Sequence, residues 1–375
     1  MFGRSIKLFN LFGFEVSIDL SWIVIAVLVS WSLATGLFPY LYHGFSPKTY
    51  WLMGAVGALG LFLSVIFHEF SHSLVARRLG LPMKGITLFI FGGVAEMGDE
   101  PPSAKVEFFM AIAGPLSSLC LVLIFYLIYS QGLAAEWPLP VNGVIRYLAY
   151  INLLLAVFNL IPAFPLDGGR ILRSILWGTW NDLRRATRVS ASIGSAFGIF
   201  LIVLGIFQLI GGNFIPGLWW FLIGLFIRGA AQMSYQQVLV RKALEGEPVR
   251  RFMNPNPVTA PGSITVEQLV EDYIYKYHYK MFPVVDNGHL LGCITTRQVK
   301  EVPREKWSQE TIGELASRGS HENTISPETD AVKALALMHQ SGTSRLLVVE
   351  GNKLVGILTL RDLMQFLSLK VELEK

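Results

Sequence analysis

The hydrophobic residues of this chain concentrate before residue 240, where they form runs long enough to cross a lipid bilayer. A transmembrane helix needs about 20 mostly apolar residues, and six runs of roughly this length alternate with short polar segments. The pattern therefore predicts a polytopic α-helical membrane protein with about six transmembrane helices. We expect these spans at Val16–Leu37, Trp51–Ala76, Val106–Tyr129, Val141–Ile161, Ile193–Ile210 and Leu218–Gln232.

One apolar stretch, Met83 to Met97, is too short to cross the membrane as a helix. It contains KGITLFIFGGVAEM, which is rich in β-branched and aromatic residues and is interrupted by Gly92-Gly93. Such a pattern is typical of two short strands joined by a turn. We therefore expect a small β-hairpin associated with the membrane.

The pattern changes at Pro248, after which the apolar runs become short and alternate with helical segments. Two of these regions resemble each other: FPVVD followed by LGCIT, and LLVVE followed by VGILT, at an offset of about 64 residues. Each copy predicts a strand, a turn, a strand and a helix. We expect a transmembrane domain at residues 1–247 and a soluble α/β module with repeats at 248–310 and 311–375.

The distribution of charge supports this division and predicts an orientation. Only 15% of the residues are charged and 52% are hydrophobic, whereas soluble domains carry about 25% charged residues. Positive charges cluster in alternate loops, which is typical of the cytosolic side, and both termini are therefore expected in the cytosol of a cell-membrane protein. The clusters are Arg4 and Lys7; Arg77, Arg78 and Lys84; Arg170 to Arg188; and Arg241 and Lys242. The net charge of +4 includes no dense basic run with interleaved aromatics, so nucleic-acid binding is not expected.

The second span contains the sequence His68-Glu69-Phe70-Ser71-His72, an H-E-x-x-H motif. Residues four apart lie on one face of a helix, so both imidazoles can bind one zinc ion while Glu69 accepts a proton from water. A polar helix face is the alternative interpretation. Ionisable groups inside a span cost about 2.5–3.5 kcal/mol each at the helix centre, which makes that alternative weak here.

A catalytic zinc site usually has three protein ligands, so a third ligand is expected elsewhere. Asp99 and Glu100 are near in sequence, but they lie in a loop without a supporting pattern. Asp167 is the better candidate, because its span returns to the side of the membrane where the second span ends. Taken alone, an Asp-Gly turn at a helix end would be the better explanation of this residue.

These motifs together resemble the site-2 protease family of intramembrane zinc metalloproteases. The resemblance covers about residues 10–235 and is carried by HEFSH, by Ala113-Gly114-Pro115 and by NLIPAFPLDG, which begins at Asn159. It implies that His68, His72 and Asp167 bind one Zn²⁺ ion per chain and that Glu69 is the catalytic base. It also implies that Asn159 stabilises the oxyanion, for which an interhelical hydrogen bond is the alternative.

The resemblance extends to the predicted hairpin and to the substrate. Phe91 to Val94, which includes Gly92, Gly93 and Val94, is similar to the family's membrane-embedded hairpin and is expected to pair with an unwound substrate. A purely structural hairpin is the alternative. The implied partner is a single-span membrane protein, whose helix must unwind before its carbonyl groups become accessible.

The two C-terminal repeats resemble a tandem pair of CBS domains over about residues 250–370. Such pairs bind adenine nucleotides (ATP, ADP or AMP), and they often dimerise. A Thr-x-x-Asp motif usually holds the ribose, and the second repeat has it as Thr359 and Asp362. The first repeat has Thr295 followed by Gln298 in place of the carboxylate, which puts this site in doubt. A structural or homodimerising tail is the alternative.

Two other functions are compatible with part of the sequence. Transporters and channels also join membrane spans to CBS tails, and Arg228 in the last span is a residue type that marks ion paths. That interpretation leaves HEFSH and Asp167 unexplained. A catalytically silent relative is the other alternative, and the intact base and ligands argue against it.

Overall fold

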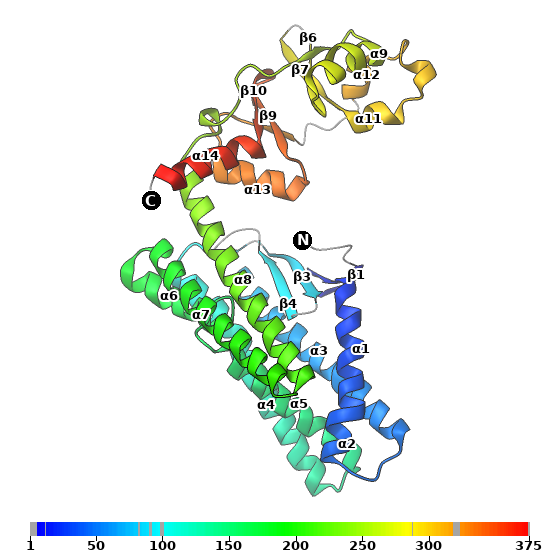
Figure 1. Ribbon diagram of the computed structural model, residues 1–375, viewed down its shortest axis with the longest axis vertical. Coiled ribbons are helices and arrows are strands. Elements are labelled where there is room, and N and C mark those ends of the chain that lie inside the picture. Colours follow the sequence, from blue (N-terminus) through cyan, green and yellow to red (C-terminus); the bar gives the residue numbers. More distant parts are fainter. Residues whose placement is uncertain are drawn as a thin grey trace. The chain divides into compact units, whose positions relative to one another are not determined.

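The computed structural model describes residues 6–11, 13–81, 83–89, 92–97, 101–286, 288–317 and 323–373 (Figure 1). The chain divides into two compact units, Met1–Gln236 and Gln237–Lys375. The first unit contains the long helices and one small sheet, and the second contains a six-stranded sheet with short helices.

Six helices of the described chain are long and apolar enough to cross a membrane, as the hydrophobic pattern predicts. Many of their leucine, isoleucine and valine side chains are exposed, which suits surfaces that face lipid rather than water. The first is α1 (Leu20–Ser32), which continues through a π-helical turn (Leu33–Leu37) into α2 (Phe38–Leu41). The others are α3 (Pro47–Arg78), α4 (Ala104–Ala134), α5 (Leu139–Asn159), α7 (Leu183–Ile210) and α8 (Phe214–Leu244).

The predicted start of the first span is wrong, because the chain before α1 forms a strand rather than a helix. Strand β2 (Phe14–Ile18) buries Phe14, Val16 and Ile18 on alternate positions, which is the period of a strand. Asp19 then accepts a hydrogen bond from the amide of Ser21 (2.9 Å) and caps α1. The apolar run is continuous across this boundary, so its length concealed the change of structure.

The predicted hairpin exists, as part of a larger sheet at one end of the helices (Figure 1). Strands β3 (Met83–Phe89) and β4 (Gly92–Met97) pair antiparallel, and β3 also pairs parallel with β2. The sheet order is β1-β2-β3-β4, with β1 at Ile6–Leu11, so β4 ends the described sheet at one edge. Strand β4 packs against α3.

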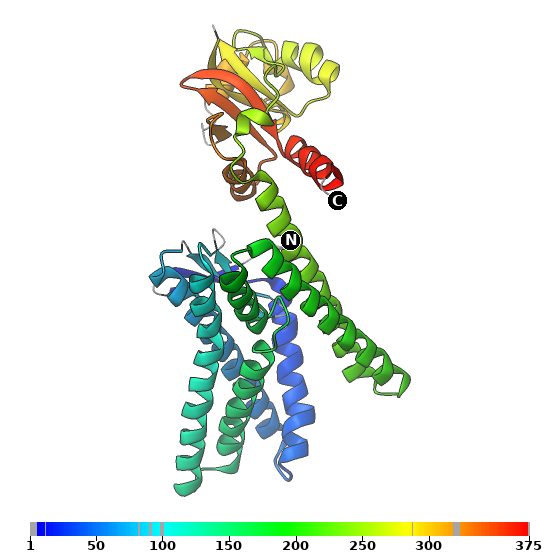
Figure 2. The same cartoon turned by 90° about the vertical axis from the view of Figure 1, so that its left-hand side faces the viewer.

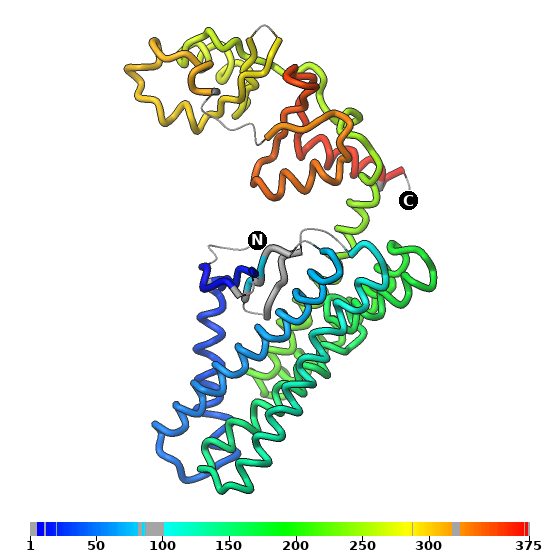
Figure 3. The backbone as a smooth tube through the Cα atoms, turned by 180° about the vertical axis from the view of Figure 1, so that it is seen from behind, coloured from blue at the N-terminus to red at the C-terminus, as the bar shows by residue number. Residues whose placement is uncertain are grey.

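Helix α3 packs against α1, α4 and α5, and α4 runs antiparallel to it (Figure 3). Ser46 caps the start of α3, and Gly80, with a φ of 84°, follows its last residues. Small residues allow close approach of the helices. A Cβ atom at Gly60 would lie 2.6 Å from the Leu148 side chain on α5.

Helices α7 and α8 form an antiparallel pair that lies side by side in two views (Figures 1 and 2). Gly198 and Gly205 on α7 face Gly224 and Gly217 on α8, and a Cβ at any of the four would lie within 3 Å of the partner helix. This spacing places the two backbones in direct contact, as is typical of small-residue helix packing in membranes.

The second unit is built around a sheet with the order β5-β6-β7-β10-β9-β8. Each repeat has the predicted strand, turn, strand and helix, and Gly288 and Gly351 adopt positive φ in the two turns. The first repeat contains β5 (Ala260–Pro261), α9 (Val266–Gln268), α10 (Tyr275–Tyr277), β6 (Met281–Asp286), β7 (His289–Thr295) and α11 (Thr296–Glu301). Helix α12 (Ile312–Ser317) follows the first repeat in the chain and packs against β7. The second contains β8 (Thr324–Ile325), α13 (Ala331–Ser341), β9 (Arg345–Glu350), β10 (Lys353–Thr359) and α14 (Leu360–Leu373).

Candidate metal centre

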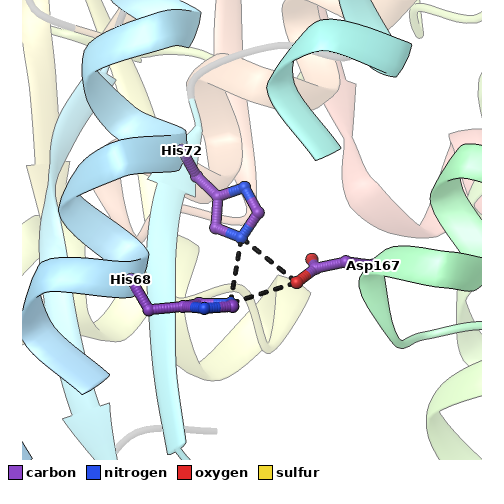
Figure 4. A group of neighbouring side chains, drawn as sticks. All are labelled: His68, His72 and Asp167. Carbon is purple, nitrogen blue, oxygen red and sulfur yellow. Dashed lines mark hydrogen bonds and ion pairs between the residues drawn. The ribbon is translucent and has the colours of Figure 1, made fainter. Parts of the chain in front are cut away.

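Three side chains from two distant segments converge on one point next to α3 (Figure 4). The Oδ2 atom of Asp167 lies 3.1 Å from Nε2 of His68 and 3.2 Å from Nε2 of His72. The two Nε2 atoms are 3.2 Å apart. Ligand atoms at the usual zinc distances in a tetrahedral site are separated by about 3.3 Å, so the triangle has the size that a zinc ion requires.

The tautomers of the two imidazoles also fit a cation. His72 donates its Nδ1–H to the carbonyl of Met110 (2.7 Å), so its Nε2 carries a free electron pair. Nδ1 of His68 lies 2.9 Å from Oγ of Ser118, which can accept a hydrogen bond in the same manner. The triangle then brings together two electron pairs and a carboxylate, an arrangement that a metal ion stabilises.

Helix α4 supplies the surroundings of both histidines from one face. Met110, Gly114 and Ser118 follow each other at four-residue spacing, and each of them meets an imidazole. A Cβ atom on Gly114 would lie 2.1 Å from Nε2 of His72 and 2.6 Å from Nε2 of His68. The sequence analysis did not assign these three roles. The four-residue spacing around Ala113-Gly114-Pro115 is the signal from which they could have been found.

Asp167 is positioned by a break in the helical chain. Helix α5 ends at Asn159, residues 160–166 are not helical, and α6 (Asp167–Trp180) begins at the aspartate itself. Gly168 and Gly169 lie in the first turn of α6, where a Cβ on either would meet the loop backbone at 2.3 Å. These glycines therefore allow the backbone of the loop to pack directly against α6. Sequence analysis did not anticipate α6.

Glu69 follows the first histidine on α3 and is partly buried. On this helix it is one residue from His68 and three residues from His72. His72 lies six residues before the end of α3 at Arg78, or about 9 Å along the helix axis. His68, Glu69 and His72 therefore lie within the membrane span but near its Arg77-Arg78 end.

Asn159 is the last residue of α5 and is partly buried. Its side chain makes no hydrogen bond to any residue that the structure describes. The interhelical hydrogen bond considered for Asn159 is found instead at Asn152, whose amide donates to Oγ of Ser64 on α3 (3.0 Å). Among the described residues, the side-chain amide of Asn159 therefore has no hydrogen-bond partner.

The other predicted site residues lie in two places. Gly92, Gly93 and Val94 belong to edge strand β4, whereas Phe91, Asp99 and Glu100 lie outside the described residues.

In the second unit, Thr359 donates its amide (2.9 Å) and its hydroxyl (2.6 Å) to Oδ2 of Asp362. Thr295 makes the same two bonds to Oε1 of Gln298, so both motifs cap the helix that follows.

Comparisons with known proteins find relatives for parts of both units. The model of peptidase family M50 matches residues 56–142 and 132–204, and the CBS domain model matches residues 249–305 and 312–369. Zinc metalloprotease MJ0392 of Methanocaldococcus jannaschii is 32% identical over 375 residues, which cover 99% of each chain.

Two further relatives are similar over long stretches. Rip3 of Mycobacterium tuberculosis is 36% identical over 366 residues, covering 97% of this chain and 93% of its own. A solved structure, the site-2 protease from Methanocaldococcus jannaschii, shares 30% identity over 62% of this chain and 95% of its own, with a TM-score of 0.44. The chain therefore belongs to peptidase family M50 and is an intramembrane zinc metalloprotease of the site-2 protease type, with a pair of CBS domains.

Proposed function

We propose that this multi-pass membrane enzyme cleaves single-span membrane proteins at a zinc centre made by His68, His72 and Asp167, with one Zn²⁺ per chain. The triangle of Nε2 and Oδ2 atoms, 3.1–3.2 Å on each side, is the observation that carries the proposal. When bound, zinc polarises the scissile carbonyl and lowers the pKa of a water molecule towards neutrality.

The protein groups then supply the proton transfers and the alignment. Glu69 accepts the proton of the attacking water and later delivers it to the leaving amine. Asn159 donates a hydrogen bond from its side-chain amide to the carbonyl oxygen as negative charge develops there. Met110 and Ser118 keep the imidazoles in the tautomer that leaves both Nε2 atoms available. Gly114 leaves the space in which the two imidazoles meet.

Strand β4 is proposed to hold the unwound substrate through Gly92, Gly93 and Val94. It ends the described sheet, so its outer backbone groups are available for an added strand, and it packs against α3. A peptide in extended form presents its carbonyls to the centre, which a helical peptide cannot do.

The positive loops and the even number of spans support a topology with both termini in the cytosol. The metal centre lies near the Arg77-Arg78 end of α3, so water would reach it from the cytosolic side. We propose a protease domain at residues 1–247 and CBS repeats at 248–310 and 311–375. The transporter alternative rested on the CBS tail and on Arg228, and the family assignment favours the protease over it.

Metal analysis of the purified full-length chain tests the ligand set. We expect one zinc per chain in the wild type, and a loss of zinc in Asp167→Ala that matches the loss in His68→Ala. Mass spectrometry of the metal content after dialysis measures both. Full zinc occupancy in Asp167→Ala would remove the aspartate from the ligand set and would leave the two histidines in place.

The CBS pair is proposed to bind one adenine nucleotide at the second repeat and to modulate cleavage, with homodimerisation through the pair. The second repeat has a carboxylate at Asp362 where the first has the neutral amide of Gln298. Of these two side chains, only the carboxylate can make charge-assisted hydrogen bonds with ribose hydroxyl groups.

Nucleotide titrations of the full-length chain test this asymmetry. Asp362→Asn keeps an oxygen that can cap α14 but loses the charge, so we expect ATP, ADP or AMP to bind about 10-fold more weakly. Gln298→Glu, in the first repeat, is the matched variant and should not weaken binding. Calorimetry that detects no binding of any adenine nucleotide to the wild type would exclude nucleotide control.

A further inference from the structure

A buried ion pair links α4 to α6 close to the metal centre. Glu107 is fully buried on α4 and accepts hydrogen bonds from Nε (2.7 Å) and Nη2 of Arg173, which is also buried, on α6. A guanidinium that donates two bonds to one carboxylate is held in a defined orientation. None of the residues assigned above to metal binding or to proton transfer belongs to this pair.

The pair closes a ring of contacts that includes the metal ligands. His72 on α3 donates to the Met110 carbonyl on α4, and Glu107 lies one helical turn before Met110. Glu107 binds Arg173, and the same short helix α6 begins with Asp167, whose Oδ2 returns to Nε2 of His72. The distance between the aspartate and the histidines therefore depends on how α6 is fixed to α4.

The non-helical loop that precedes Asp167 is held by the same arginine. The Arg173 guanidinium lies 5.1 Å from the centre of the Phe164 ring, which is itself buried. The backbone of Phe164 is enclosed by two glycines, Gly169 on α6 and Gly194 on α7, where no side chain would fit. Arg173 thus contacts both Phe164, in the loop that precedes Asp167, and Glu107 on α4.

We propose that Glu107 and Arg173 are positioning residues that hold Asp167 at its distance from His68 and His72 and so set the zinc affinity. Breaking the pair would let α6 shift and open the triangle. Residues that orient metal ligands typically change metal affinity about 10- to 100-fold when replaced. The proposal rests on the ligand set given above.

Zinc competition titrations on the full-length protein in detergent test the proposal. Titrations of the wild type and of Asp167→Ala first establish that the measured zinc is bound at this site. If Asp167→Ala bound zinc as tightly as the wild type, the ligand set would be wrong, whereas the result would say nothing against the ion pair itself. Arg173→Lys keeps the charge but cannot reproduce the two bonds from Nε and Nη2. We expect it to fold and to bind zinc about 10-fold more weakly.

A neutral pair provides the rescue. Arg173→Gln leaves the buried carboxylate of Glu107 without its arginine and should lose the most zinc affinity. Adding Glu107→Gln removes that charge and permits an amide hydrogen bond, so the double variant should recover part of the affinity. Asn142→Ala is the control. Asn142 is also buried, but it lies near the start of α5, at the opposite end of the helices, where its side-chain amide donates a hydrogen bond to the carbonyl of Trp137.

The thermal unfolding midpoint, measured with and without zinc, separates positioning from general stability. At a fixed zinc concentration, zinc raises the midpoint by an amount that grows with the logarithm of its affinity for the folded state. Asn142→Ala should lower the midpoint in both conditions but keep the full rise, whereas Arg173→Lys should lose much of the rise. Wild-type zinc affinity in both arginine variants, or an equal loss of affinity in Asn142→Ala, would refute the positioning role.

Discussion

Glu69→Gln is expected to lower the rate of peptide-bond cleavage by about 10²- to 10⁴-fold while the chain keeps its zinc. Glutamine has nearly the shape of glutamate, but its amide cannot accept the proton of the attacking water at neutral pH. The three ligand atoms belong to His68, His72 and Asp167, so the replacement leaves the triangle intact. This variant should therefore keep the zinc content of the wild type while its cleavage rate falls.

Comparison of membrane proteomes from cells that express wild-type or Glu69→Gln protein measures the effect without knowledge of the substrate. Substrate spans should accumulate uncut in the variant. Glu15→Gln is the matched control, because Glu15 is an exposed carboxylate on β2 that pairs with Lys7. Undiminished cleavage by Glu69→Gln would exclude Glu69 as the base and would leave the ligand set standing.

The parts of the site that could be predicted from sequence are those encoded locally. The spacing of His68 and His72 places both on one helix face whatever surrounds the helix. Asp167 lies 95 residues from His72 in the chain, and it was identified by its place in a second motif and by the topology of its span. Gly114, Met110 and Ser118 depend on the register between α3 and α4, which only packing determines.

The fold shows the same division between local and distant information. Six long apolar runs predicted the six membrane helices because a bilayer imposes a length. Strand β2 was missed because the apolar run continues from it into α1 without a break, and because one of its two partners, β3, is about 70 residues away in the chain and pairs with it in parallel. Helix α6 was missed because the arginine-rich stretch after Asp167 was interpreted only as a topological signal.

Gly114→Ala is expected to abolish zinc binding and cleavage together. One added methyl group would lie 2.1 Å from Nε2 of His72 and 2.6 Å from Nε2 of His68, at the point where the ligands converge. Both imidazoles must rotate away, which also breaks their hydrogen bonds to Met110 and Ser118. We expect zinc affinity to fall at least about 100-fold, measured by chelator competition on the purified chain.

The same substitution at Gly229 separates this effect from any general effect of alanine in a membrane helix. Gly229 lies on α8, and no atom of the described residues comes within 4 Å of a Cβ placed there. Alanine favours a helix over glycine by up to about 1 kcal/mol, so neither variant should lose helical structure. Gly229→Ala should therefore bind zinc and cleave as the wild type does. If Gly114→Ala also keeps its zinc, the metal cannot lie between the two histidines and α4, because the methyl group occupies that space.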